Sequence, residues 1–424
     1  MNDKRIDPSP SCKDDFDPES LDCDSARRRI LDSVSPVRGF ERLALRSALG
    51  HVLTEDISSP IDVPSHTNSA MDGYAVKGDD LLESDFHEFK LVGTSLAGKP
   101  WPGKVKSGQC VRIMTGAVMP KGADTVVMQE HVKREGDKVL IGPYQKPGQN
   151  VRKAGEDLSV GQLVLPSGRR LTPADLGLIA SLGLAEVTVY RRLRVAFFST
   201  GDELRSMGEP LKTGEIYDSN RYTLYGMLKK LDVELLDMGV IRDAPDALRN
   251  AFQTASSSTD VVISSGGVSV GEADYVKETL NELGEVNFWK VAMKPGRPLT
   301  FGRLGEAVFF GLPGNPVSVM VTFYQFVLPA LRKMMGEKCP SPLTVKARCL
   351  SKLRKRPGRT EYQRGILETA KNGELVVRKT GNQGSGILRS MSEANCFILL
   401  DKDSAGIDEG ALVDVQPFSS FFQD

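Results

Sequence analysis

The chain has 424 residues, which is too long for one ordinary domain and suggests roughly three domains. Hydrophobic residues make up 40% and charged residues 26%, proportions that are typical of a globular chain with sizeable cores. Lys plus Arg equals Asp plus Glu, at 55 each, so the formal net charge is zero. Because no long-range positive field results, the balance argues against a dedicated nucleic-acid binder.

Three features bear on where the protein works. Residues 1–20 are acidic and rich in Pro, Ser and Asp, which predicts a disordered tail rather than a secretory signal. The longest apolar stretch, residues 317–331, is interrupted by polar residues and is short of a membrane span, so it predicts a buried helix. The six cysteines have no metal-binding spacing and are interpreted as reduced thiols. We therefore expect a cytoplasmic protein that does not contact a membrane.

The first part of the chain predicts mostly β structure between two helices. Apolar spacing predicts a short helix over residues 24–35. From about residue 52 to 150, short β-favouring runs alternate with Gly and Pro turns, a pattern typical of a β-rich domain. A second helix is predicted over residues 172–182, where Thr172 suits the N-cap and Asp175 completes a capping box.

The clearest alternation of strands and helices covers residues 191–336. The predicted strands are residues 194–198, 233–238, 260–264 and 308–311. The predicted helices lie near residues 219–231, 245–256, 272–283 and 315–328. This order predicts a doubly wound parallel sheet with helices on both faces. A small all-β domain or barrel is predicted after it, with strands at residues 344–349, 375–378, 397–400 and 412–415.

Carboxylates gather where the strands of the predicted sheet end, and this edge is where such sheets bind ligands. Asp202 and Glu203 follow the first strand, and Asp243 and Asp274 follow the next two. Crowded carboxylates are costly unless a cation neutralises them. Because no histidine lies beyond residue 131, the metal ligands would be oxygens, and we predict Mg²⁺. For Asp243, an N-cap turned to solvent is an equally good interpretation.

Two more segments suit an anion. Gly266 and Gly267 lead into a helix whose first N–H groups favour a phosphate, although a tight turn that needs positive φ is the alternative. Lys290, Lys294 and Arg297 form a cationic cluster that suits a phosphate or another oxyanion, with plain surface charge as the alternative. No P-loop and no nucleophile elbow occurs. The residues alone indicate metal-assisted chemistry on a phosphate or pyrophosphate ester.

Nine segments carry a resemblance to one known family. They are residues 69–75, 112–117, 152–157, 199–204, 217–220, 264–275, 290–298, 311–316 and 384–391. In these segments the sequence resembles the MoeA family, the molybdopterin molybdenumtransferases, which are related to the E domain of gephyrin. The resemblance runs from about residue 20 to the end of the chain. By spacing alone, the first and third of these segments are typical of ordinary turns.

The resemblance implies a multidomain fold of α/β plus β type. An elongated discontinuous domain would comprise residues 21–59 and 156–190, with a β-rich domain inserted at residues 60–155. Residues 191–338 would form an α/β domain that resembles molybdopterin adenylyltransferase, and residues 339–424 a C-terminal β-barrel. Members of this family are typically homodimers, with the active site between the α/β domain of one subunit and the inserted domain of the other.

The resemblance also implies a reaction in molybdenum cofactor biosynthesis. Molybdenum from molybdate enters adenylylated molybdopterin, the pyrophosphate bond is cleaved and AMP leaves. The expected catalytic residues are Asp72, Thr115, Asp157, Glu203, Asp243, Asp274, Lys290 and Lys294, of which Glu203, Asp243 and Asp274 also hold Mg²⁺. The expected substrate-binding residues are Arg152, Gly266, Gly267, Ser269, Arg297, Pro313, Gly314, Asn315, Pro316 and Ser385. The expected protein partners are the adenylyltransferase and downstream cofactor-delivery proteins.

Two other functions fit parts of the sequence. A molybdopterin adenylyltransferase resembles residues 191–336 alone, and the additional domains argue against it. A non-catalytic dimeric scaffold of cofactor assembly is the other candidate. It has no need for a combined set of carboxylates and lysines, here Glu203, Asp274, Lys290 and Lys294. One departure from the family concerns the loop at Asp243, which has a single Asp where relatives often have two, so only Asp243 is assigned there.

Overall fold

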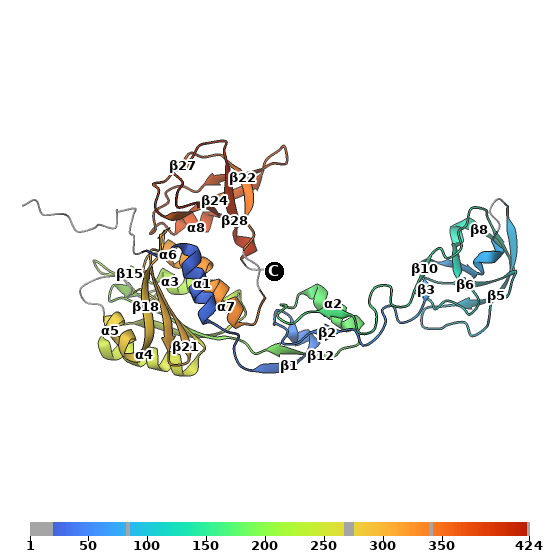
Figure 1. The fold of residues 1–424 in the computed structure, drawn as a ribbon, viewed down its shortest axis with the longest axis horizontal. Coiled ribbons are helices and arrows are strands. Elements are labelled where there is room, and N and C mark those ends of the chain that lie inside the picture. Colours follow the sequence, from blue (N-terminus) through green and yellow to red (C-terminus); the bar gives the residue numbers. More distant parts are fainter. Residues whose placement is uncertain (1–19, 82–84, 267–274, 339–341, 422–424) are drawn as a thin grey trace, which may run out of the picture.

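The computed structural model describes residues 20–81, 85–266, 275–338 and 342–421. The chain is elongated: an α/β body and a C-terminal β body lie together at one end, and an inserted β body lies at the other (Figure 1). A thin waist joins them. All but the last residue of the predicted tail at residues 1–20 lies outside the described residues. Among the helices of these ranges, none is both long and apolar enough to cross a membrane.

The α/β body is built on a mixed sheet of strand order β16-β13-β17-β21-β20-β18. Its strands are β13 (Arg194–Thr200), β16 (Glu234–Ile241), β17 (Val261–Ser265), β18 (Gly284–Lys290), β20 (Pro298–Leu304) and β21 (Ala307–Leu312). The first four in spatial order are parallel, as predicted. Two strands beyond the four predicted ones extend the sheet, and β20 pairs antiparallel with both β18 and β21. The tight connection from β20 to β21 permits only a hairpin.

Helices cover both faces of this sheet, as the alternation of strands and helices predicted. They are α3 (Ser219–Lys229), α4 (Pro245–Ser258) and α5 (Tyr275–Leu283), with α1 (Cys23–Ser33) and a C-terminal helical run. Along β13, Ala196 and Phe198 pack with α4 and α5, whereas Val195 and Phe197 pack with α1 and α3. Strands buried on both faces are continuous apolar runs, which explains the sequence of β13.

A proline shapes the buried helical run α6 (Pro316–Thr322), η4 (Phe323–Val327) and α7 (Leu328–Met334), of which η4 is a π-helical turn. Pro329 has no N–H, so the carbonyl of Gln325 loses its helical donor. Arg27 of α1 supplies one: its Nε donates to Gln325 O at 3.2 Å and its Nη2 to Gln325 Oε1 at 2.9 Å. We expected residues 21–59 to belong to the elongated domain, but α1 packs in the α/β core.

The waist contains two short β pairings and a helix. Strands β1 (Phe40–Ala44) and β12 (Glu186–Tyr190) pair antiparallel, as do β2 (Ile57–Ser58) and β11 (Leu163–Leu165). The predicted second helix is α2 (Pro173–Ser181). Its capping box is confirmed, because Asp175 N donates to Thr172 Oγ1 and Thr172 N donates to Asp175 Oδ2.

The inserted body is a mostly β domain, as predicted. Its sheet has the order β7-β4-β6-β5-β9-β8. The strands are β4 (Gly73–Val76), β5 (His87–Ser95), β6 (Gln109–Ile113), β7 (Thr125–Met128), β8 (Val132–Glu135) and β9 (Lys138–Ile141). A small pairing of β3 (Asn68–Ser69) with β10 (Val151–Arg152) lies where the domain meets the waist.

Among the described C-terminal residues, five strands close into a barrel, because β24 pairs with both β25 and β26. The strands are β22 (Val345–Cys349), β24 (Thr360–Thr369), β25 (Leu375–Lys379), β26 (Cys396–Leu400) and β28 (Leu412–Pro417). The barrel is fastened to the α/β body in two ways. Strand β19 (Met293–Lys294) pairs with the start of β24, and Tyr324 stacks on Phe418 at 5.5 Å. The two bodies therefore share one core.

Replacing Arg27 tests the link between α1 and the π-helical turn. Arg27→Ala removes the donor to the Gln325 carbonyl and is expected to lower the free energy of unfolding by about 1.5–3 kcal/mol, as for hydrogen bonds from charged groups. Arg29→Ala, at an exposed position of the same helix, is the control and is expected to change it by less than about 0.5 kcal/mol. Equal midpoints in urea denaturation for both variants would contradict the link.

Candidate active site

The carboxyl ends of the parallel strands bring two of the predicted loops together. Thr200 ends β13 and pairs in register with Ile241, which ends β16. The loops that carry Glu203 and Asp243 therefore start side by side. They also touch further on, since Asp243 N lies 3.4 Å from Asp202 Oδ1 and donates to it.

The oxygen-rich edge fits a hard metal ion in its chemistry. Asp243 is not the cap of α4, because Ala244 occupies the N-cap position, so that alternative is wrong. Asp202 and Glu203 are exposed, and Asp274 lies outside the described residues. Within the described ranges, no three acidic, His or Cys side chains are grouped closely enough to hold a metal. The donors that the edge does offer are carboxylate oxygens, which suit Mg²⁺.

Gly266 is held in a conformation that only glycine adopts easily. Its φ is +92°, and a Cβ atom there would lie 2.4 Å from the carbonyl oxygen of Thr200. Its N–H already donates to Leu312 O at 3.2 Å, so this group does not point at a ligand. The alternative explanation, a tight turn with positive φ, therefore fits Gly266. Gly267 and Ser269 lie outside the described residues.

Buried polar atoms mark the same edge. Thr200 Oγ1, Ser264 Oγ and Asn220 Oδ1 are buried and have no hydrogen-bond partner among the described residues. Buried polar atoms are nearly always bonded, so these three atoms leave unused hydrogen-bonding capacity at this edge. The neighbouring loop after β21 contains Pro313, buried, and Gly314, exposed.

The C-terminal domain reaches this loop directly. Ser385 O accepts a hydrogen bond from Val317 N at 3.0 Å, in the first turn of α6, which begins at Pro316. Asn315 occupies the N-cap position of that helix without a side-chain cap bond. The structure thus places the predicted Ser385 beside the predicted 313–316 loop.

The predicted cationic cluster lies at this edge too. Strand β18 runs in the same direction as β21, because both are antiparallel to β20 between them. Lys290 at the end of β18 and Arg297 just before β20 are therefore at the carboxyl edge. Lys294, between them, reaches the barrel: its Nζ lies 3.1 Å from Glu361 Oε1. Glu361 is buried and also accepts from Gln363 Nε2 at 2.9 Å.

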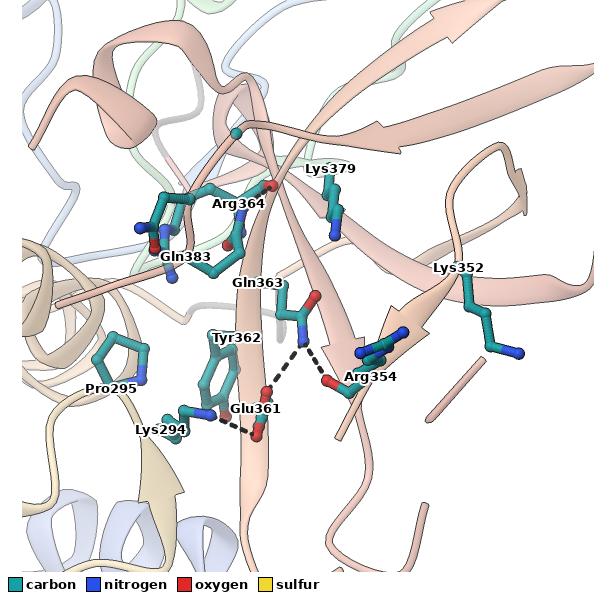
Figure 2. A pocket seen from close by; sticks show the side chains of 12 residues that line it. Lys294, Pro295, Lys352, Arg354, Glu361, Tyr362, Gln363, Arg364, Lys379 and Gln383 are labelled. Carbon is teal, nitrogen blue, oxygen red and sulfur yellow. Dashed lines mark hydrogen bonds and ion pairs between the residues drawn. The ribbon is translucent and has the colours of Figure 1, made fainter. Parts of the chain in front are cut away.

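A pocket of about 320 Å³ opens between this loop and the barrel (Figure 2). Its charged lining residues, all described, are Lys294, Lys352, Arg354, Arg364 and Lys379 with Glu361. The excess of positive charge favours an oxyanion. Arg364 is buried, which lowers its pKa to about 10, and it remains charged at neutral pH. Its Nε donates to Ser390 Oγ at 3.1 Å and its Nη2 to Gly384 O at 3.2 Å.

The other predicted residues lie in the inserted domain and the waist. Asp72 Oδ1 accepts from Thr115 N at 2.7 Å and from Thr115 Oγ1 at 2.8 Å. These bonds lower the pKa of Asp72, the amide bond having the larger effect. Arg152 pairs with Asn68 across β10 and β3, where the inserted domain meets the waist. Asp157 is in the waist, where its N–H donates to Val63 O at 3.0 Å.

Within one chain, the predicted site is divided between two distant places. Asp72 directly precedes β4 and Thr115 follows β6 in the inserted body, which Figure 1 shows at the far end of the molecule from the α/β body. One half of the site carries carboxylates and cations, and the other carries the Asp72–Thr115 pair.

This fold defines a class of protein in which an α/β domain with a ligand-binding edge carries a barrel and an inserted β domain. Family models match it in order: the MoeA N-terminal region (domains I and II) over residues 21–183, a probable molybdopterin binding domain over residues 196–333 and the MoeA C-terminal region (domain IV) over residues 346–418. The chain belongs to the MoeA family.

Known proteins are similar along nearly the whole chain. The molybdopterin molybdenumtransferase of Haemophilus influenzae is 45% identical over 94% of this chain and 99% of its own length. That of Nostoc sp. is 38% identical over 87% of each chain. A crystal structure of the molybdopterin biosynthesis moeA protein from Pyrococcus horikoshii OT3 matches with a TM-score of 0.82 and 30% identity, covering 94% of this chain and 100% of that one.

The Asp72–Thr115 contact can be tested by titration. Thr115→Val removes the hydroxyl donor and keeps the amide donor, so the pKa of Asp72 is expected to rise part of the way toward its ordinary value. Carboxyl-detected NMR over a pH series measures this shift. Thr115→Ser keeps a hydroxyl and is expected to leave the pKa low. An unchanged pKa in the valine variant would show that the hydroxyl bond contributes nothing in solution.

Proposed function

We propose that this protein is a cytoplasmic molybdopterin molybdenumtransferase that inserts molybdenum from molybdate into adenylylated molybdopterin and releases AMP. The relatives with this name, at 45% and 38% identity, support the role in molybdenum cofactor biosynthesis. The observation that carries the proposal is the path of residues 290–297. This loop leaves the carboxylate edge of the sheet and enters the cationic pocket, so a metal site and an oxyanion site would adjoin one substrate.

The carboxylate edge would bind the pyrophosphate end of the substrate. Mg²⁺ held by Glu203, Asp243 and Asp274 would neutralise the phosphate charge. Gly267 and Ser269, which follow β17 in the chain, would contact the phosphates. Further contacts to the substrate would come from the remaining predicted residues of this half, Gly266, Arg297, Pro313, Gly314, Asn315, Pro316 and Ser385.

The cationic pocket would bind molybdate. Lys294 is held at the pocket by the buried Glu361, and Arg364 is held by Ser390 and the Gly384 carbonyl. Fixed cations of this kind stabilise charge without reorganisation as the pyrophosphate bond breaks. Lys290, at the end of β18, would act with them on the departing AMP phosphate. Arg364 was not among the residues predicted from the sequence.

A second subunit would complete the site. Asp72, Thr115, Arg152 and Asp157 belong to the inserted domain and the waist, and Figure 1 shows the inserted body far from the α/β body of its own chain. A homodimer in which each inserted domain meets the other subunit's α/β edge would bring the halves together. The substrate would come from the adenylyltransferase, and the product would pass to downstream cofactor-delivery proteins.

AMP release from adenylylated molybdopterin is the first test. With Mg²⁺ we expect release that depends on molybdate, and at least a ~100-fold loss in Glu203→Gln and Asp274→Ala, comparable to removing one stabilising group in an active site. Glu234→Gln, an exposed carboxylate at the opposite end of β16, is the control and keeps its activity. Turnover of molybdopterin with ATP and without molybdate would instead indicate an adenylyltransferase. No release from a folded dimer would favour the scaffold.

The molybdate pocket makes a separate prediction. Lys294→Gln and Arg364→Gln are each expected to raise the KM for molybdate by about 10-fold or more, because each removes a charged hydrogen-bond donor. The KM for adenylylated molybdopterin is expected to change much less. Lys346→Gln, on β22 and paired with Asp414, is the control for loss of one positive charge. Equal effects on both substrates would place molybdate elsewhere.

A further inference from the structure

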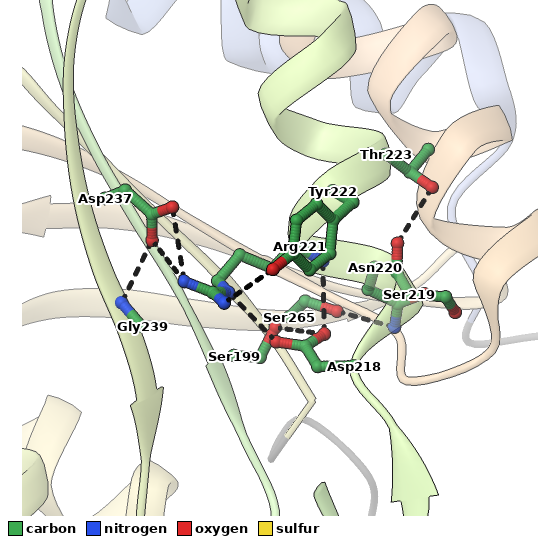
Figure 3. A network of polar contacts seen from close by, with 10 residues as sticks. All are labelled: Ser199, Asp218, Ser219, Asn220, Arg221, Tyr222, Thr223, Asp237, Gly239 and Ser265. Atoms are coloured by element: carbon green, nitrogen blue, oxygen red, sulfur yellow. Dashed lines mark hydrogen bonds and ion pairs between the residues drawn. The ribbon is translucent and has the colours of Figure 1, made fainter. Parts of the chain in front are cut away.

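The first turn of α3 lies across the carboxyl edge of the sheet and is tied to the strands on both sides. Asp218 is the N-cap of α3 and accepts from Arg221 N at 3.1 Å. The same carboxylate oxygen accepts from Ser199 Oγ at 3.0 Å, so the helix start is fixed to β13. Asp218 and Ser199 are both buried. Figure 3 shows this network.

Two neighbouring side chains extend the network to the flanking strands (Figure 3). Arg221 Nη1 donates to Asp237 Oδ1 at 3.1 Å, which fixes the turn to β16. Asn220 Nδ2 donates to Ser265 Oγ at 2.9 Å, at the end of β17. The same Nδ2 donates to Gly314 O at 2.7 Å, in the loop that follows β21. The turn therefore has a hydrogen bond to each of the four parallel strands or the loop after it.

Asn220 is the residue of this turn that joins the end of β17 to the loop after β21. Ser265 directly precedes Gly266 and the glycine-rich loop, and Gly314 belongs to the 313–316 loop. A primary amide nitrogen has two N–H donors, so one Asn side chain can serve both acceptors at once. Aspartate has the same shape but no donor, and alanine has neither.

We propose that Asn220 is a positioning residue for molybdenum insertion, which sets the spacing between the end of β17 at Ser265 and the loop after β21 at Gly314. The inference rests on the proposed site at this edge. Ser265 and Gly314 lie at the carboxyl ends of different strands, so their separation would determine where the phosphates of the substrate lie relative to the cations and carboxylates. Preorganised distances of this kind affect the rate of the chemical step more than they affect the affinity for substrate.

The test measures steady-state AMP release by the dimer with adenylylated molybdopterin, molybdate and Mg²⁺. Asn220→Ala and Asn220→Asp are expected to lower kcat by about 100-fold, as for misplacement of reacting groups by about 1 Å. The KM for adenylylated molybdopterin is expected to change by less than about threefold, since the distant contacts to the substrate remain. Thr223→Val is the matched control, because Thr223 Oγ1 bonds only to Ser219 O within the same helix in the described contacts.

A structural role alone gives a different pattern. If the loss of kcat in Asn220→Ala follows a lowered melting temperature and disappears in the cold, or if Asn220→Asp keeps kcat within about threefold of the wild type, the positioning role is overturned. Glu203→Gln in the same assay separates the two proposals. Full activity in Glu203→Gln overturns the proposed site itself, whereas an inactive Glu203→Gln beside an active Asn220→Ala overturns only the positioning role.

Discussion

Parallel pairing of β16, β13, β17 and β21 is the constraint on which the rest of this molecule depends. Backbone hydrogen bonds align these strands, so their carboxyl ends, and the loops that follow them, open at one edge. Carboxylates, buried polar atoms and the glycine turn gather there because of strand direction and not because they are close in sequence. The first turn of α3 then braces that edge, with hydrogen bonds from Asn220 and Arg221 and to Asp218.

Packing of the barrel against the α/β body brings in the positively charged residues of the proposed site. Strand β19 leaves the α/β body and pairs with β24, which puts Lys294 beside the buried Glu361. Behind this contact, Tyr324 of the π-helical turn packs on Phe397 at 5.6 Å and on Phe418, so the pocket wall rests on a shared aromatic core. A pocket between two bodies keeps its shape only when they are packed rigidly together, and here one core spans both.

The inserted domain contrasts with this close packing of two bodies. A slender waist connects it to the rest of the chain, yet its Asp72–Thr115 pair is already assembled by two short hydrogen bonds. Local hydrogen bonds can prepare such a pair without any other domain. Its use in a reaction at the α/β edge requires a neighbour, and for that reason the homodimer is part of the proposed function.

Much of the fold was predictable because its signals are local. Four strands and the helices of residues 194–334 follow from apolar runs and turn residues, and the Thr172–Asp175 cap from spacing within one turn. The loops at the carboxyl edge were predictable once the sheet was recognised. Other features were not, because they are set by contacts between distant residues. Arg27 bonds Gln325 across 298 positions, β20 reverses direction, and β24 buries the polar Glu361 and Arg364, which a sequence pattern assigns to the surface. The sequence by itself determined the family, the helices and four strands of the α/β body, and which loops follow those strands at the carboxyl edge. Only the tertiary structure decided which side chains share a pocket, because burial and ion pairing depend on how the domains pack.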